Sequence, residues 1–112
     1  MRGDRLRLLD AIEQLDIIRV FSARGKEAFL TDLMVQSAIL HRLTLLGEAC
    51  RALSDTLRAD HPEIPWPQII AFRNVLIHQY FGMHPDLVWT ILEAHVPPLE
   101  SALRLILESL PE

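Results

Sequence analysis

The residues best suited to chemistry lie in one short segment, Arg73 to Phe81, with the sequence RNVLIHQYF. It places Arg73, His78 and Tyr80 inside an otherwise apolar run. The fixed fork of donors on arginine suits phosphate oxygens, and histidine can transfer protons near neutral pH. Burying an arginine is costly unless a partner neutralises it, so this segment needs a reason beyond packing.

A helix over this segment would place the polar groups on two different sides. At about 100° per residue, Arg73 lies near the middle of an apolar stripe, and His78 lies about 140° away on the side of Asn74. Asn74 and His78 are four residues apart, so their side chains can touch. The same spacing also fits a structural arginine satisfied by a carboxylate, with an ordinary histidine on the polar face. The residues that share the face of Arg73 are Trp66, Ile69, Ile70, Leu76, Ile77 and Tyr80.

Gly47 and Glu48 supply the partner that we expect for Arg73. A glycine inside a helix costs about 1 kcal/mol relative to alanine, so Gly47 is expected to allow close approach of another helix. Glu48 then falls on an apolar stripe, where a buried arginine would satisfy its carboxylate. Glu48 with Arg73 is therefore the candidate pair, and Arg42 and Arg51 are the competing partners for Glu48.

Helical spacing and capping residues predict the elements of the first half of the chain. We expect a helix over about 4–23, ended by Gly25, and one short turn over 26–30. Thr31 or Asp32 suits the N-cap of a second helix over about 32–60, which would be about 40 Å long.

Prolines divide the second half of the chain. The segment 61–67 contains Pro62, Pro65 and Pro67 and reads as a stiff linker, with a third helix from near Pro67 to near Gly82. A fourth helix is expected to start at Pro85 or Asp86, and the pair Pro97 and Pro98 should break or kink it before a final helix over about 99–110.

The helix expected over 32–60 has apolar residues on two opposite sides. One stripe is continuous, and the other is interrupted by His41 and Glu48. A helix that is apolar on two sides is buried on two sides, and a small bundle has little room to surround it, so we expect a homodimer. The first stripe contains Val35, Ile39, Leu46, Cys50, Leu53 and Leu57, and the second contains Leu30, Met34, Ala38 and Leu45.

Composition narrows the fold and the classes of function. The chain has 112 residues, enough for one domain over 1–112, and half of them are hydrophobic. Glycines are scarce and strand-like alternation is absent, so an all-α bundle of four to five helices is expected. The net charge of −4 argues against a general basic nucleic-acid binder, although a few arginines could still form a local cationic cleft.

Several features predict a protein of the cytoplasm without metal or cofactor. No uncharged apolar run of about 18 residues is present, and the N-terminus lacks the apolar core of a signal peptide. The single Cys50 cannot form an internal disulfide, which fits a reducing compartment. The five histidines show none of the spacings typical of metal ligands.

The motif Arg73-x4-His78-x-Tyr80 resembles the R-x4-H-x-Y signature of HEPN-domain proteins of the HepT kind. The resemblance extends over most of the chain, in order and spacing. The segments that carry it are Phe29-Leu30-x-Asp32, Leu46-Gly47-Glu48-Ala49, Pro62-Glu63-Ile64-Pro65-Trp66, Arg73 to Gly82 and Val88-Trp89.

This resemblance implies a dimeric helical bundle and a toxin that is a metal-independent ribonuclease. It implies that Arg73 and His78 are the catalytic pair and that Asn74 assists them. It also implies a partner, a minimal nucleotidyltransferase of the MntA type, which neutralises the toxin by transferring AMP to Tyr80. Without the resemblance, Tyr80 would be interpreted as a core aromatic residue with its hydroxyl at the rim.

The side chains suit that chemistry. Cleavage of RNA by its own 2′-hydroxyl needs proton removal from that oxygen and stabilisation of charge at the phosphorus. DNA lacks the attacking hydroxyl and would not be cut. The alternative is a non-catalytic helical dimer that binds a nucleotide or the partner nucleotidyltransferase. An accessible Arg73 and His78 cleft would favour the ribonuclease, and an Arg73 fully buried and ion-paired within its own bundle would favour the binding module.

Overall fold

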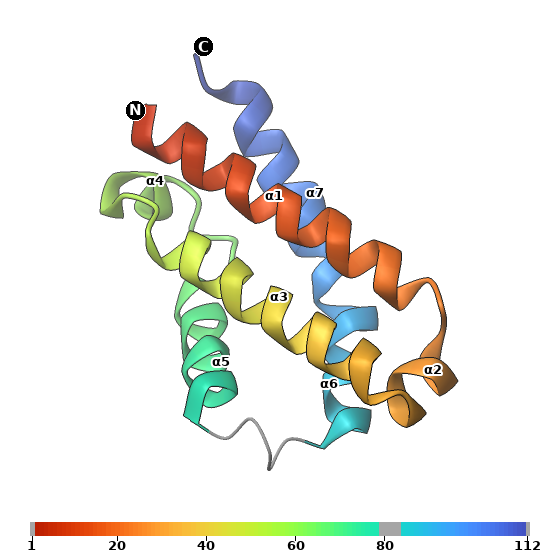
Figure 1. Ribbon diagram of the computed structural model, residues 1–112. Coiled ribbons are helices and arrows are strands. Elements are labelled where there is room, and N and C mark those ends of the chain that lie inside the picture. Colours follow the sequence, from red (N-terminus) through yellow and green to blue (C-terminus); the bar gives the residue numbers. More distant parts are fainter. Residues whose placement is uncertain (1, 79–83, 112) are drawn as a thin grey trace.

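The computed structural model describes residues 2–78 and 84–111, and within these ranges all regular structure is helical (Figure 1). The expected all-α class is therefore confirmed. Five helices are ten residues or longer, and two are short. In chain order they are α1 (Arg2–Ser22), α2 (Lys26–Thr31), α3 (Leu33–Arg51), α4 (Asp55–Asp60), α5 (Trp66–His78), α6 (Pro85–Ala94) and α7 (Val96–Ser109).

Helices α1 and α3 form the centre of the bundle and run antiparallel to each other (Figure 1). Helix α7 packs on α1, and α5 packs on α3. Helix α6 packs against α7 and against the short α2. Because α5 is held by α3, the residues that α3 presents to it decide where the Arg73 segment sits.

The core follows the apolar stripes expected from the sequence. The continuous stripe of α3 and its extension is buried, with exposed fractions between 0% and 6%. Its partners on α1 are Leu8, Ala11, Ile12, Leu15 and Ile18. The second stripe behaves differently, because Met34 is 82% exposed and Leu30, Ala38 and Leu45 are only partly buried.

The prediction of one long helix over 32–60 is wrong, because a turn after Arg51 separates α3 from α4. Ser54 caps α4, with its Oγ accepting from the Leu57 backbone N–H at 3.1 Å. The buried Asp4 of α1 holds this turn, since its carboxylate accepts from the Ser54 N–H at 2.8 Å and from the Ser54 hydroxyl at 2.7 Å. Helices α3 and α4 are therefore separate elements, and α3 alone is about 28 Å long.

Other boundaries agree more closely with expectation. Gly25 adopts φ 96° between α1 and α2, a backbone conformation that favours glycine. Asp32 is the N-cap of α3 and accepts from Met34 N–H at 2.9 Å. A helix break before the proline pair is confirmed, but α7 starts at Val96 rather than near Leu99, because prolines fit the first turn of a helix. The expected end of the third helix near Gly82 lies outside the described residues.

Candidate active site

Arg73 lies where α5 comes closest to α3. A Cβ atom added at Gly47 would stand 2.6 Å from the Cβ of Arg73 and 3.0 Å from its Cγ. Real side chains do not approach so closely, so only glycine allows this contact. The close helix approach predicted for Gly47 is confirmed, and it fixes the aliphatic stem of Arg73 between two helices.

The Arg73 guanidinium has two partners near its outer end. Its Nη2 donates to the Glu48 carboxylate, and its Nη1 donates to Asn74 Oδ1 at 2.8 Å. The ion pair expected between Glu48 and Arg73 is thus present. Of the competing partners, Arg42 donates to Gln14 Oε1 instead, at 3.1 Å, and Arg51 forms no ion pair with Glu48 in the described part of the chain.

Burial differs between the two ionic partners. The side chain of Arg73 is 16% exposed, whereas that of Glu48 is 43% exposed. The Nε of Arg73 is buried and has no hydrogen-bond partner among residues 2–78 and 84–111. Solvent therefore reaches the guanidinium mainly at its outer end, beside Glu48 and Asn74.

The other members of the motif lie at the surface or outside the described ranges. Asn74 and His78 are exposed, and His78 is the last residue of α5. The hydrogen bonds and ion pairs of the described residues join Arg73 to Asn74 and Glu48, but none joins Arg73 to His78. Tyr80 lies outside the described residues. One protomer thus brings together an arginine, an amide and a carboxylate, with a histidine one turn beyond the amide on the same side of α5.

This site adjoins the exposed stripe of α3. At about 100° per residue, Glu48 lies within about 80° of Met34, Ala38, His41 and Leu45 around the α3 axis. On α5, Ile77 lies about 40° from Arg73 around the axis and is 45% exposed. The exposed Ile77 therefore lies beside the polar site on α5, and the partly buried Leu45 lies one turn before Glu48 on α3. Met34 shares the side of Glu48 but lies about 21 Å away along the α3 axis.

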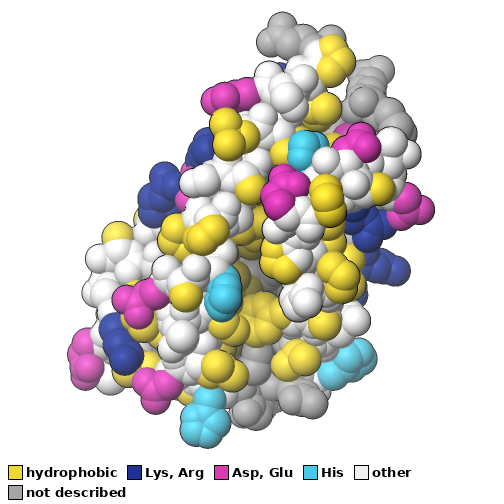
Figure 2. All heavy atoms as spheres, turned by 180° about the vertical axis from the view of Figure 1, so that it is seen from behind, with side chains coloured by type: hydrophobic (Ala, Val, Ile, Leu, Met, Phe, Trp, Pro, Cys, Tyr) yellow, Lys and Arg dark blue, Asp and Glu magenta, His cyan; other side chains and the backbone are white. Residues whose placement is uncertain are grey.

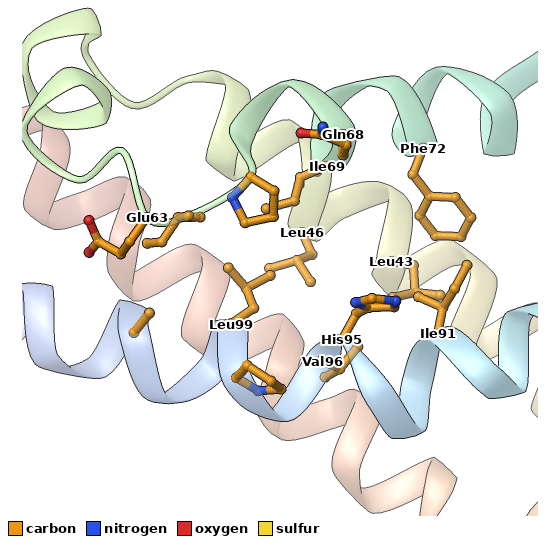
Figure 3. Close-up of a pocket in the computed structure, with 15 residues that line it drawn as sticks. Leu43, Leu46, Glu63, Gln68, Ile69, Phe72, Ile91, His95, Val96 and Leu99 are labelled. Atoms are coloured by element: carbon orange, nitrogen blue, oxygen red, sulfur yellow. The ribbon is translucent and has the colours of Figure 1, made fainter.

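A second feature, which the sequence interpretation missed, is an apolar cleft of about 770 Å³. Figure 2 shows apolar side chains along a hollow on the rear face, and Figure 3 shows the lining residues. Leu43 and Leu46 of α3 form its floor, Phe72 of α5 one wall, and Ile91 and Leu99 of α6 and α7 the other. Because it joins separate helices, no local sequence pattern could have revealed it.

The cleft and Asn74 lie on different sides of α5, although Gly47 lines the cleft and also contacts the stem of Arg73. Phe72, which faces the cleft, is about 160° from Asn74 around the helix axis. Glu63, Gln68 and His95 are the polar side chains among the lining residues. The cleft therefore reaches the aliphatic stem of Arg73 at Gly47, whereas Arg73, Asn74 and His78 are not among its lining residues.

Two further properties describe the molecule outside the site. In the ranges 2–78 and 84–111, no three His, Cys, Asp or Glu side chains gather where they could hold a metal ion. None of the helices described combines the length and the apolar character needed to span a membrane.

The family follows from comparison of the whole chain with known proteins. The family model for HepT-like ribonucleases, described as "Ribonuclease HepT-like", matches residues 9–106. The chain belongs to the HepT-like ribonuclease family. The resemblance seen in the R-x4-H-x-Y motif is thereby confirmed for the chain as a whole.

Two relatives of this HepT-like protein cover most of the chain. "Probable ribonuclease HepT" of Thermococcus cleftensis is 33% identical over 94 residues, which cover 83% of this chain and 86% of the relative. "Putative RNase MJ1380" of Methanocaldococcus jannaschii is 30% identical over 100 residues, which cover 88% of this chain and 92% of the relative. No solved structure matches the chain.

Proposed function

We propose that this HepT-like protein is a ribonuclease that acts as the toxin of a toxin–antitoxin pair. One observation carries the proposal: α5 fixes Arg73 beside Asn74 and presents His78 at the surface one turn further on. These are the residues at which the family motif has its catalytic groups. The names of the relatives, which describe ribonucleases, support the same activity.

The proposed reaction uses the 2′-hydroxyl of RNA as the nucleophile. His78 removes the proton from that oxygen, since histidine is a side chain that can transfer protons near neutral pH. Arg73 donates hydrogen bonds to the phosphate oxygens as negative charge develops, and Asn74 orients the guanidinium through its Oδ1. As the 2′-oxygen bonds to phosphorus, the bond from phosphorus to the 5′-oxygen of the next nucleotide breaks, and that oxygen leaves with a proton taken from water. The products are a 2′,3′-cyclic phosphate and a 5′-hydroxyl, and the proposed mechanism uses no metal ion.

Two copies of the chain would complete the site. Arg73 and His78 are about 140° apart around α5, which is awkward for a single phosphate. The second apolar stripe of α3, with the exposed Met34 and the partly buried Ala38, runs along the same side of the helix as Glu48. Burying this stripe against a second copy would bring two sets of Arg73 and His78 towards one cleft. Such a cleft would also concentrate positive charge in a protein of net charge −4.

The proposed regulator is a nucleotidyltransferase that transfers AMP to Tyr80. The added group would bring bulk and a negative phosphate to the position where RNA phosphate must bind. Steric blocking and like-charge repulsion would then silence the nuclease. The support for this step is the place of Tyr80 in the motif, two residues after His78.

The nuclease is tested with purified protein and total RNA in EDTA. Wild type is expected to cleave, and His78→Ala is expected to lose at least about a hundredfold in rate, which is the usual size of one acid–base contribution. His84→Ala is the matched control, since it removes an exposed histidine from the start of α6. Equal cleavage by wild type and His78→Ala would show that His78 is not catalytic, and a requirement for metal would contradict the proposed mechanism.

The dimer is tested by light scattering at micromolar concentration. Wild type should have twice the chain mass of 12.8 kDa, and Met34→Glu should shift it towards the monomer because it places a charge on the proposed interface. Leu105→Glu is the control, since Leu105 is also an exposed apolar residue, 66% exposed on α7. A wild-type monomer would defeat both the dimer and the composite site.

The regulator is tested with the cognate nucleotidyltransferase and ATP. Wild type should gain one or more AMP units by mass spectrometry, whereas Tyr80→Phe, which lacks the acceptor oxygen, should gain none. Cells that express Tyr80→Phe should remain arrested in growth even when the partner is co-expressed. If the partner still neutralises Tyr80→Phe, inhibition works through complex formation instead.

A second function has one observation in its favour. Arg73 is 16% exposed and ion-paired within its own bundle, as expected of a structural arginine in a non-catalytic binding module. In that case the chain would be a helical dimer that binds a nucleotide or the nucleotidyltransferase. The RNA cleavage assay separates the ribonuclease from the binding module, because a binding module would form a complex with the partner without cutting RNA.

A further inference from the structure

Arg73 and Glu48 differ in how freely each side chain can move. The stem of Arg73 lies against Gly47, and its side chain is mostly buried, so the guanidinium has little room to leave its place. Glu48 is 43% exposed and lies on the second, interrupted stripe of α3, so its flexible side chain can turn into solvent. Any anion that reaches Arg73 must therefore meet a fixed guanidinium and a movable carboxylate.

The donors of Arg73 show why an anion must remain there. Its Nε is buried without a partner among the described residues, so the outer Nη groups carry the bonds to Glu48 and Asn74. A mostly buried guanidinium with no acidic partner is unfavourable. A bidentate phosphate at the outer edge would take the bond that Glu48 now accepts, and it would be repelled by the carboxylate while that carboxylate stayed.

We propose that the Glu48 carboxylate is the resident anion of the active site and that an RNA phosphate must displace it from Arg73. The inference rests on the proposed function, and it assigns Glu48 a role beyond neutralising a buried charge. Glu48 is a positioning residue that keeps the Arg73 guanidinium aligned and paired with an opposite charge while the site is empty. It also sets the affinity for RNA, because the phosphate has to compete with a carboxylate of the same sign.

RNA affinity is the first test, with a 2′-O-methyl RNA oligonucleotide that lacks the attacking hydroxyl. Glu48→Gln keeps the length of the side chain and an oxygen for Nη2 but removes the charge. It should bind this RNA at least about threefold more tightly than wild type, since one repulsive charge is gone. Glu48→Asp, which keeps the charge, should bind within about twofold of wild type or more weakly. Glu13→Gln, an exposed position on α1, is the control for net charge and should not change the affinity by more than about twofold.

The second test is the salt dependence of RNA binding, which a merely structural role of Glu48 would not change. Each cation that neutralises a phosphate of single-stranded nucleic acid adds about 0.7 to the slope of log affinity against log salt. Glu48→Gln frees the charge of Arg73 and should steepen this slope by about that amount, whereas Glu13→Gln should not. Weaker RNA binding or an unchanged slope in a folded Glu48→Gln would overturn the inference.

A measurement on the wild-type chain covers the case in which Glu48→Gln does not fold. The carboxyl ¹³C resonance of Glu48, assigned in labelled protein, should shift when the 2′-O-methyl RNA binds, because the carboxylate loses its guanidinium partner. Binding of RNA without that shift would overturn the inference and leave the nuclease proposal intact. Failure of wild type both to bind and to cut RNA would instead overturn the proposed function.

Discussion

Gly47 of α3 lies directly against the side chain of Arg73 of α5, so closely that a Cβ atom at position 47 would stand 2.6 Å from the Arg73 Cβ. Position 48, the next residue along α3, provides the carboxylate that pairs with the same arginine. Two neighbouring residues of α3 thus set how closely α3 approaches α5 and which negative charge faces Arg73.

We expect Gly47→Ala to destabilise the protein by about 1–3 kcal/mol, because the new methyl group overlaps the stem of Arg73 and the two helices must move apart. The better helix propensity of alanine would offset about 1 kcal/mol of that cost. Urea unfolding gives the change in free energy. Gly3→Ala in α1 is the matched control, since nothing lies within 4 Å of a Cβ there, and it should be neutral or stabilising. Equal stability of Gly47→Ala and wild type would mean that the helices are not in this close contact.

Asp4 should be essential for the turn between α3 and α4. Its buried carboxylate accepts two hydrogen bonds from Ser54, so Asp4→Ala leaves the Ser54 N–H and hydroxyl without a partner. The expected loss is about 1.5–3 kcal/mol, the usual range for hydrogen bonds to a charged group. Asp10→Ala, at an exposed position of the same helix, should stay within about 0.5 kcal/mol of wild type in the same urea experiment. Similar losses in the two variants would contradict the role of Asp4.

Acid should weaken the contact between α1 and α7. Burial by itself would raise the pKa of Glu100, but hydrogen bonds and charge from Arg19 and Arg104 outweigh it and hold the pKa below its ordinary value of 4.5. A lowered carboxyl pKa in the folded state contributes stability that is present above about pH 4.5 and is lost as the pH falls through the folded value.

Glu100→Gln should accordingly be less stable than wild type at pH 7, and the difference should shrink as the pH is lowered below 4.5. Urea unfolding at a series of pH values measures this. Glu108→Gln, an exposed position on the same helix, serves as the control and should differ little from wild type at any pH. A difference for Glu100→Gln that does not change with pH would show that its ion pairs do not control acid stability.

Cys50 should be inert in the folded protein. It is fully buried in the core, and this burial raises the pKa of its thiol to about 12. Because the thiolate is the reactive form, iodoacetamide at pH 8 should modify native protein at least about a hundredfold more slowly than protein in denaturant. Mass spectrometry follows the added mass. Rapid and complete modification of native protein would mean that the helix pair α1 and α3 opens readily around Cys50.

The sequence by itself determined the helical class and the buried stripe of α3, and it predicted Glu48 as the candidate partner of Arg73, with Arg42 and Arg51 as competitors that the structure excluded. The reason is that helical spacing fixes which side chains share a face, and a buried charge needs an opposite charge nearby. Gly47 beside Glu48 gave a local signal of close contact, and the structure has that contact at Arg73. The assignment of Arg73, Asn74, His78 and Tyr80 to a reaction remains a proposal that rests on the family motif.

Tertiary structure alone decided the features that depend on residues far apart in the chain. Helical periodicity continues through Ser54, yet the helix breaks there because Asp4, fifty residues earlier, supplies the bonds that hold the turn. The apolar cleft beside Phe72 depends on how far α5 stands from α6 and α7, and that distance is set by the packing of α5 on α3, of α7 on α1 and of α6 on α7 and α2. The mostly buried position of Arg73 and the more exposed one of Glu48 likewise follow from where the two helices cross, which no local pattern encodes.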